Sequence, residues 1–165
     1  MFASLDPTRA PKSRLSVILK TVADGVSERM EPLRQVERFK NAGIEAWFKV
    51  EVFHALRDTD PVLRPQNKGP DLVLRNGLEI ELKGATDFNI KGWFVPGLKY
   101  GTPCMFLGWT VRADVDVMAL HHATTFETVD VHCLRGSGWH VGMIVPRDYF
   151  QPTPSSNAAA SKAVA

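Results

Sequence analysis

Residues 69–84 (GPDLVLRNGLEIELKG) gather acidic and basic side chains in a segment that otherwise has the composition of a small β-hairpin. Three of them are carboxylates, Asp71, Glu79 and Glu81, and Lys83 follows two positions after Glu81. Carboxylates brought close together share a proton, face water or bind a cation. Oxygen ligands of this kind favour a hard ion such as Mg²⁺ or Mn²⁺.

The register of this hairpin decides which side chains share a face. A two-residue loop at Asn76-Gly77 would mix apolar and charged side chains in every cross-strand pair. A three-residue loop over residues 75–77, with Gly77 in the left-handed conformation, instead makes one face wholly aliphatic. We predict this second register, because a slip by one residue would turn the aliphatic face away from the core. The predicted pairs are Leu74 with Leu78, Leu72 with Ile80, and Asp71 with Glu81.

In this register Asp71 and Glu81 are expected side by side, with Cβ atoms about 4.5 to 5.5 Å apart. Like charges placed directly opposite each other are destabilising, so a bound cation would give a reason for both carboxylates. The alternative is an exposed, acid-rich edge hairpin on which Lys83 merely pairs with Glu81. Glu79 is interpreted as a solvated side chain of that kind.

Pro70-Asp71, followed after nine residues by Glu81-Leu82-Lys83, resembles the signature of the PD-(D/E)XK nuclease superfamily. The resemblance implies a restriction-endonuclease-like α/β/α fold with a central mixed β-sheet flanked by helices. It also implies that Asp71, Glu81 and the backbone carbonyl of Leu82 hold Mg²⁺ or Mn²⁺, and that Lys83 orients or activates the attacking water. The implied activity is metal-dependent endonuclease hydrolysis of phosphodiester bonds in nucleic acid, with DNA as the expected substrate.

Many members of this superfamily place a further glutamate on the helix before the motif strands, here expected over residues 43–58. Glu45 has Lys49 four residues later, which is an ordinary solvated pair on a helix. Glu51 projects among apolar side chains at helical spacing, so its carboxylate needs a partner. We assign Glu51 to the catalytic and metal site, with Glu45 as the competing candidate. The other interpretation of Glu51 is an ion pair with an arginine inside the helical layer.

The chain has 165 residues, of which 44% are hydrophobic and 23% charged, enough for one α/β or α+β domain with a core. Apolar residues at helical spacing over 13–58 predict about three helices, and the pattern then changes to that of strands. We expect one domain over 12–150, with residues 1–11 and 151–165 as disordered tails. The expected strands are Leu72–Leu74, Leu78–Lys83, Cys104–Val111, Thr128–Leu134 and Trp139–Val145.

A net charge of +2 means that an anionic partner must be met by a local patch. Lys91 and Lys99 stand among Trp93 and Tyr100, a mixture that suits phosphate contacts and base stacking. The other interpretation of this segment is a short amphipathic helix that covers the sheet. Cleavage of both strands of a duplex would call for two active sites, and hence for a homodimer.

No apolar span reaches 18 residues, and the first 15 residues carry prolines and charges where a signal peptide has an apolar region. We therefore expect a cytoplasmic protein without a membrane partner. Cys104 and Cys133 lie in apolar runs and are expected as buried thiols, with a disulfide between them as the alternative. Two rival functions remain open: a catalytically silent nucleic-acid-binding module on the same fold, and an interaction protein whose acidic hairpin docks a basic partner.

Overall fold

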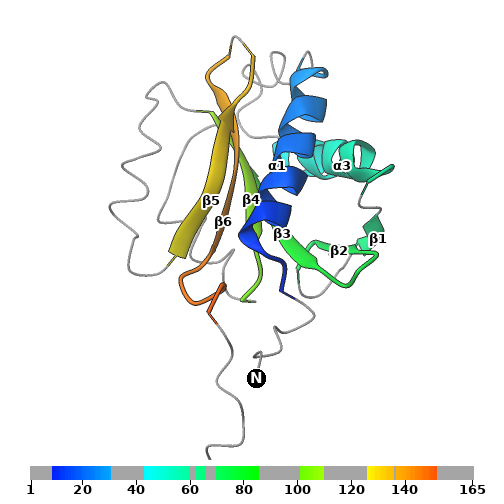
Figure 1. Ribbon diagram of the computed structural model, residues 1–165. Coiled ribbons are helices and arrows are strands. Elements are labelled where there is room, and N and C mark those ends of the chain that lie inside the picture. Colours follow the sequence, from blue (N-terminus) through cyan, green and yellow to red (C-terminus); the bar gives the residue numbers. More distant parts are fainter. Residues whose placement is uncertain are drawn as a thin grey trace, which may run out of the picture.

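The computed structural model describes residues 9–30, 43–59, 62–65, 70–85, 101–109, 126–135 and 137–151. The elements are helices α1 (Lys12–Ser27) and α3 (Ile44–Leu56), and strands β1 (Val62–Pro65), β2 (Leu72–Leu74), β3 (Glu79–Ala85), β4 (Cys104–Trp109), β5 (Phe126–Cys133) and β6 (Trp139–Pro146). Both described helices precede all the strands along the chain (Figure 1). The expected α+β class is confirmed for this part of the chain.

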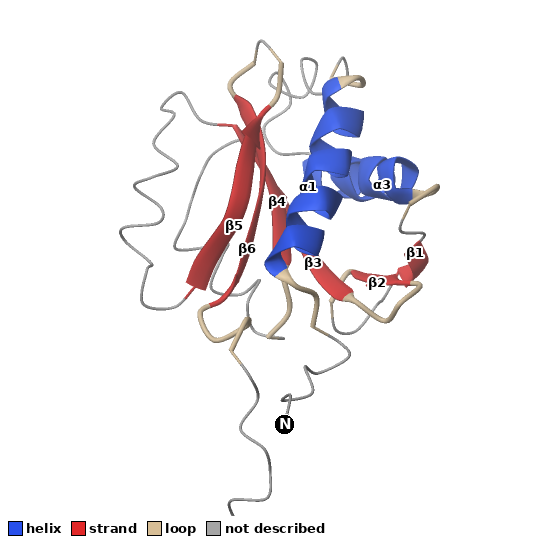
Figure 2. Cartoon of the chain, in the orientation of Figure 1, coloured by secondary structure: helices blue, strands red, loops and turns tan. Residues whose placement is uncertain are grey.

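The strands form one sheet in the order β1-β2-β3-β4-β6-β5. Among the described strands, β3 and β4 run parallel and every other pair of neighbours runs antiparallel, so the expected mixed sheet is confirmed (Figure 2). Strand β1 was not predicted, because four residues with an arginine and a terminal proline carry little strand signal. Its place at the edge of the sheet is where a proline is tolerated.

Strands β2 and β3 form a hairpin with the predicted register, and Leu72 lies opposite Ile80. The Leu74 N–H donates to the Leu78 carbonyl, and the Gly77 N–H donates to the Leu74 carbonyl, each at 2.8 Å. Gly77 has a φ of 83°, the left-handed conformation that a three-residue loop with a bulge requires. The three-residue turn is therefore confirmed.

Helices α1 and α3 pack on each other and on one face of the sheet, where they form a single apolar core. The strand residues in this core alternate along each strand: Leu72, Leu74, Ile80, Leu82, Met105, Leu107, Val141, Met143 and Val145. Because successive side chains of a strand point to opposite faces, Glu79, Glu81 and Lys83 project from the other face of β3. The described residues include no helix on that other face, so the second helical layer expected of an α/β/α fold is not found in this part of the chain.

The folded domain begins before the predicted boundary at residue 12. Ala10 is buried, and its N–H donates to the Tyr149 hydroxyl at 3.1 Å. Arg9 donates to the carbonyls of Asp148 and Tyr149 at 3.1 and 3.0 Å. These contacts fix residues 9–11 against the end of the sheet, so they are not part of a tail. Gln151, the first residue of the predicted C-terminal tail 151–165, is also described, and its N–H donates to the Asp148 carbonyl at 3.0 Å. The other predicted tail residues, 1–8 and 152–165, lie outside the described residues.

The two cysteines differ in burial. Cys104 is buried, as predicted, and burial raises the pKa of its thiol to about 12. Cys133 is exposed, so the prediction of its burial was wrong; it ends β5, which is an edge strand. Both thiols are free, so the alternative of a disulfide between them is not found. In the described part of the chain, no helix has the length and apolar character needed to cross a membrane.

Candidate metal site

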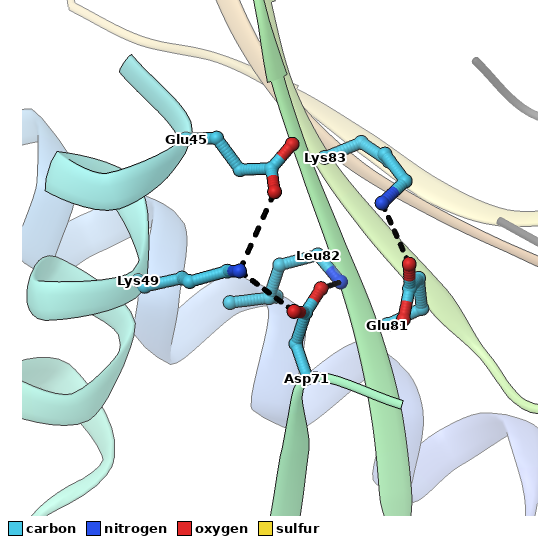
Figure 3. A network of polar contacts seen from close by, with 6 residues as sticks. All are labelled: Glu45, Lys49, Asp71, Glu81, Leu82 and Lys83. Carbon is cyan, nitrogen blue, oxygen red and sulfur yellow. Dashed lines mark hydrogen bonds and ion pairs between the residues drawn. The ribbon is translucent and has the colours of Figure 1, made fainter. Parts of the chain in front are cut away.

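Acidic and basic side chains meet where α3 crosses β3 beside the start of β2 (Figure 3). We call them the acid–lysine cluster: Glu45, Lys49, Asp71, Glu81 and Lys83. Helix α3 comes close to β3 at this point because Gly84 has no side chain; a Cβ there would lie 3.1 Å from the Cα of Glu45. Glu45 and Lys49 therefore reach the cluster from the helix, while Glu81 and Lys83 lie on the other side of β3.

Asp71 lies directly before β2, and its carboxylate turns into the edge of β3. Oδ2 accepts a hydrogen bond of 2.8 Å from the Leu82 N–H, and Oδ1 lies 2.7 Å from Lys49 Nζ. The hairpin register would place Asp71 opposite Glu81, but Figure 3 shows the two carboxylates turned apart, Asp71 toward Lys49 and Glu81 toward Lys83. In an extended strand the N–H and the carbonyl of one residue point to the same edge, so the Leu82 carbonyl faces the Asp71 side.

Glu81 is the most deeply buried carboxylate of the cluster, with 7% of its side-chain surface exposed. Its Oε1 lies 2.6 Å from Lys83 Nζ. Its Oε2 is buried and has no hydrogen-bond partner among the described residues. A buried carboxylate oxygen without a donor costs free energy, because the water it has lost is not replaced. A cation beside Oε2 would remove that cost.

Lys49 joins the helix to the hairpin. Its Nζ lies 3.4 Å from Glu45 Oε1, which confirms the predicted pair on α3, and 2.7 Å from Asp71 Oδ1. Burial acts to lower the pKa of Lys49, but the hydrogen bond and charge of Asp71, together with Glu45, outweigh it and hold the pKa above its usual value. Lys49 is therefore a charged link between two carboxylates, which the solvated-pair interpretation did not foresee.

Lys83 is subject to the charges of all three carboxylates. Burial acts to lower its pKa, while the hydrogen bond from Lys83 to Glu81 and the charges of Glu45, Glu81 and Asp71 raise it, and the net pKa lies above the usual value. Lys83 therefore stays protonated at neutral pH. It can donate hydrogen bonds and stabilise negative charge, but it is poorly suited to accept a proton.

Glu51 does not lie beside Asp71 and Glu81, where the sequence analysis predicted it. Its side chain is 9% exposed, and its Oε2 lies 3.6 Å from Nη1 of Arg29, which follows the end of α1. Two positions along a helix correspond to a rotation of about 200°, so Glu51 points away from the side of α3 that carries Lys49. The structure corrects the assignment of Glu51 to the metal site: it belongs to an ion pair between two helices, which was the other interpretation. Glu45 is the carboxylate that α3 brings toward Asp71.

The donor set of the cluster suits a hard divalent cation, although the side chains are not yet arranged around one. Carboxylate oxygens of Asp71 and Glu81 and the carbonyl of Leu82 are the ligand types that Mg²⁺ and Mn²⁺ prefer. In the described part of the chain, no three acidic, histidine or cysteine side chains are already grouped as metal ligands. The orphaned Oε2 of Glu81 fits a cation, whereas the lysine contact at Asp71 would have to change.

Other predicted contacts lie outside the described residues. They are the nucleic-acid-binding candidates Lys91, Trp93, Lys99 and Tyr100. Lys49 is the member of the cluster that sequence reasoning missed. Its spacing from Glu45 was visible, but its contact with Asp71 depends on how α3 packs against β3.

No protein-family model, no curated protein and no solved structure matches this chain. The acid–lysine cluster and its position in the fold are therefore the basis for a functional proposal.

Proposed function

We propose that this chain is a Mg²⁺- or Mn²⁺-dependent endonuclease of the PD-(D/E)XK superfamily, with a restriction-endonuclease-like fold. Its expected substrate is DNA, its expected compartment the cytoplasm, and its expected assembly a homodimer that supplies one active site to each strand. The observation that carries the proposal is the buried, unpartnered Oε2 of Glu81, which lies on the same face of β3 as Lys83.

The charge of the acid–lysine cluster supports a role for a divalent cation. Three carboxylates and two ammonium groups leave a formal charge of −1, which repels a phosphodiester. A divalent ion would change that charge to +1 and make the same place attractive to phosphate. When bound, the ion would neutralise the scissile phosphate and lower the pKa of a water molecule beside it.

The chain's own residues would hold the cation, orient the water and stabilise the phosphate charge. Asp71, Glu81 and the Leu82 carbonyl would hold the cation, and Glu45 would reach it directly or through a water molecule. Lys83 is protonated at neutral pH, because its pKa is raised, so it would orient the attacking water and stabilise charge on the phosphate oxygens. The neighbouring Cys104 thiol, opposite Glu81 on β4, stays neutral and unreactive because burial raises its pKa to about 12.

Nuclease assays with and without Mg²⁺ or Mn²⁺ test the proposal, on labelled duplex, single-stranded and branched DNA and on RNA. Glu81→Gln and Lys83→Ala should each lower metal-dependent cleavage by at least about 100-fold, since each removes a group that acts on the reacting phosphate or water. Glu79→Gln is the matched control, because Glu79 projects from the same face of the same strand. Full activity in both site variants would rule out the assignment.

A catalytically silent binding or interaction module on the same fold is the second candidate. It is favoured by one observation: the carboxylates of Asp71 and Glu81 are each already paired with a lysine. Titration calorimetry with Mn²⁺ separates the two candidates. Heat of binding that is lost in Asp71→Asn supports the enzyme, and a flat titration in the unmodified protein supports the silent module.

A further inference from the structure

Lys49 is the part of the acid–lysine cluster to which the proposed nuclease function gives no role. Its ammonium group lies between Asp71 and Glu45, at the edge of β3 where the Leu82 carbonyl also points. We infer that the Lys49 ammonium group competes with the divalent metal ion for the carboxylate of Asp71. This inference rests on the proposed function. Metal binding at Asp71 then requires the displacement of the Lys49 side chain, and we call this requirement the gate.

The geometry at Asp71 makes Lys49 and a metal ion mutually exclusive. Lys49 Nζ lies 2.7 Å from Oδ1. A Mg²⁺ ion bound to the same oxygen would lie about 2.1 Å from it, which leaves two positive centres within roughly 4 Å of each other. Charges this close repel strongly in a partly buried site. One of the two cations must leave.

Asp71 cannot escape this competition by turning away. Its second oxygen, Oδ2, accepts the Leu82 N–H at 2.8 Å, and rotation of the carboxylate would break that bond. Lys49 is the more mobile partner, because its side chain is 35% exposed against 16% for Asp71 and has a flexible four-carbon stem. Glu45 lies 3.4 Å from Nζ and offers a second anchor after displacement.

The carboxylate of Glu81 is held differently from that of Asp71. Lys83 binds Oε1 of Glu81 and leaves Oε2 without a partner, so Glu81 has an oxygen ready for a cation. At Asp71 one oxygen is held by the backbone and the other by Lys49. The barrier to metal entry is therefore at Asp71, and Lys49 sets it.

The test is calorimetric titration of the full chain with MnCl₂ in four forms: unmodified, Lys49→Met, Lys49→Arg and Asp71→Asn. Lys49→Met keeps the length of the stem and removes the charge, so we expect it to bind Mn²⁺ at least about tenfold more tightly than the unmodified protein. Lys49→Arg keeps the competing charge and should not tighten binding. Lys20→Met is a further control, since Lys20 makes a comparable helical pair with Asp24 on α1.

The outcomes separate the gate from the proposed function. If Asp71-dependent Mn²⁺ binding is equally strong with lysine, arginine or methionine at position 49, the gate is overturned and the nuclease proposal stands. If neither the unmodified protein nor Lys49→Met binds Mn²⁺, both are overturned. Binding that appears only in Lys49→Met supports the gate and counts against metal-dependent cleavage by the unmodified protein. Circular dichroism checks the fold of each variant, and Lys49→Gln provides the same comparison if Lys49→Met does not fold.

Discussion

Glu51 on α3 and Glu81 on β3 lie at nearly the same depth, with 9% and 7% of their side-chain surfaces exposed. In each, Oε2 is buried and accepts no hydrogen bond from the described residues. Among the described residues each also has one basic partner, Arg29 for Glu51 and Lys83 for Glu81. By burial and by the number of ionic partners, the two glutamates are alike.

They differ in which oxygen faces the positive charge. At Glu51 the oxygen without a hydrogen bond is also the one that lies 3.6 Å from Arg29, so its charge is compensated where it is buried. At Glu81 the lysine holds Oε1, and Oε2 is left over. Glu51 therefore joins α3 to the residue that follows α1, whereas Glu81 has one carboxylate oxygen that no described residue contacts by a hydrogen bond or an ion pair. Burial of a carboxylate does not by itself identify a functional site.

Cleavage assays should separate the two glutamates most strongly. If the proposed function is right, Glu81→Gln should lower metal-dependent cleavage by at least about 100-fold, because it removes a charge that would hold the proposed cation. Glu51→Gln should keep activity within a few fold, because Glu51 does not reach Asp71 or Lys83. Comparable losses in the two variants, with both proteins folded, would show that the distinction drawn between them is mistaken.

Stability measurements test the structural role of Glu51. Arg29→Met removes its positive partner and leaves a buried carboxylate uncompensated, which should lower the free energy of unfolding by about 3 kcal/mol. Part of this loss comes from His54, which also contacts Arg29. Chemical denaturation should give the same loss in unfolding free energy with and without about 5 mM Mn²⁺. A loss that Mn²⁺ reverses would place a metal at Glu51.

Lys83→Met is the corresponding change at Glu81, and here Mn²⁺ should matter. Removal of the lysine leaves Glu81 uncompensated, so the free energy of unfolding should fall by about 2 kcal/mol in the absence of metal. A cation that binds the folded protein would restore part of that stability. Thermal unfolding with and without Mn²⁺ measures the restoration. Equal destabilisation in both conditions would argue that Glu81 is a structural residue like Glu51.

The hairpin could be predicted from the sequence because its determinants are local. Alternation of Leu78, Ile80 and Leu82 with charged neighbours, together with Gly77 at the turn, allows one register that buries an aliphatic face. Several helix and strand positions followed from local patterns in the same way. Strand β1 was missed because an arginine and a terminal proline take two of its four positions and leave little strand signal.

The candidate site was less predictable because it depends on contacts between elements. Helical projection showed correctly that Glu51 points inward, but not that Arg29, which follows a different helix, would meet it. The Lys49–Asp71 contact requires α3 to approach β3 at Gly84, a distance that no local pattern encodes. The exposure of Cys133 likewise follows from the position of β5 at the edge of the sheet.

The smallest expected effect concerns alkaline pH and distinguishes the two basic partners. The pKa of Lys83 is higher in the folded protein than its usual value of 10.5, so its stabilising contribution is complete below that pH and is lost as pH rises through the folded pKa. The difference in unfolding free energy between the unmodified protein and Lys83→Met should therefore shrink above pH 10.5. Arg29→Met should show a constant difference over the same range, because a guanidinium does not lose its proton there. Denaturation curves collected from neutral to strongly alkaline pH measure both differences, and a parallel decline in the two variants would contradict the assignment of the effect to the Lys83–Glu81 pair.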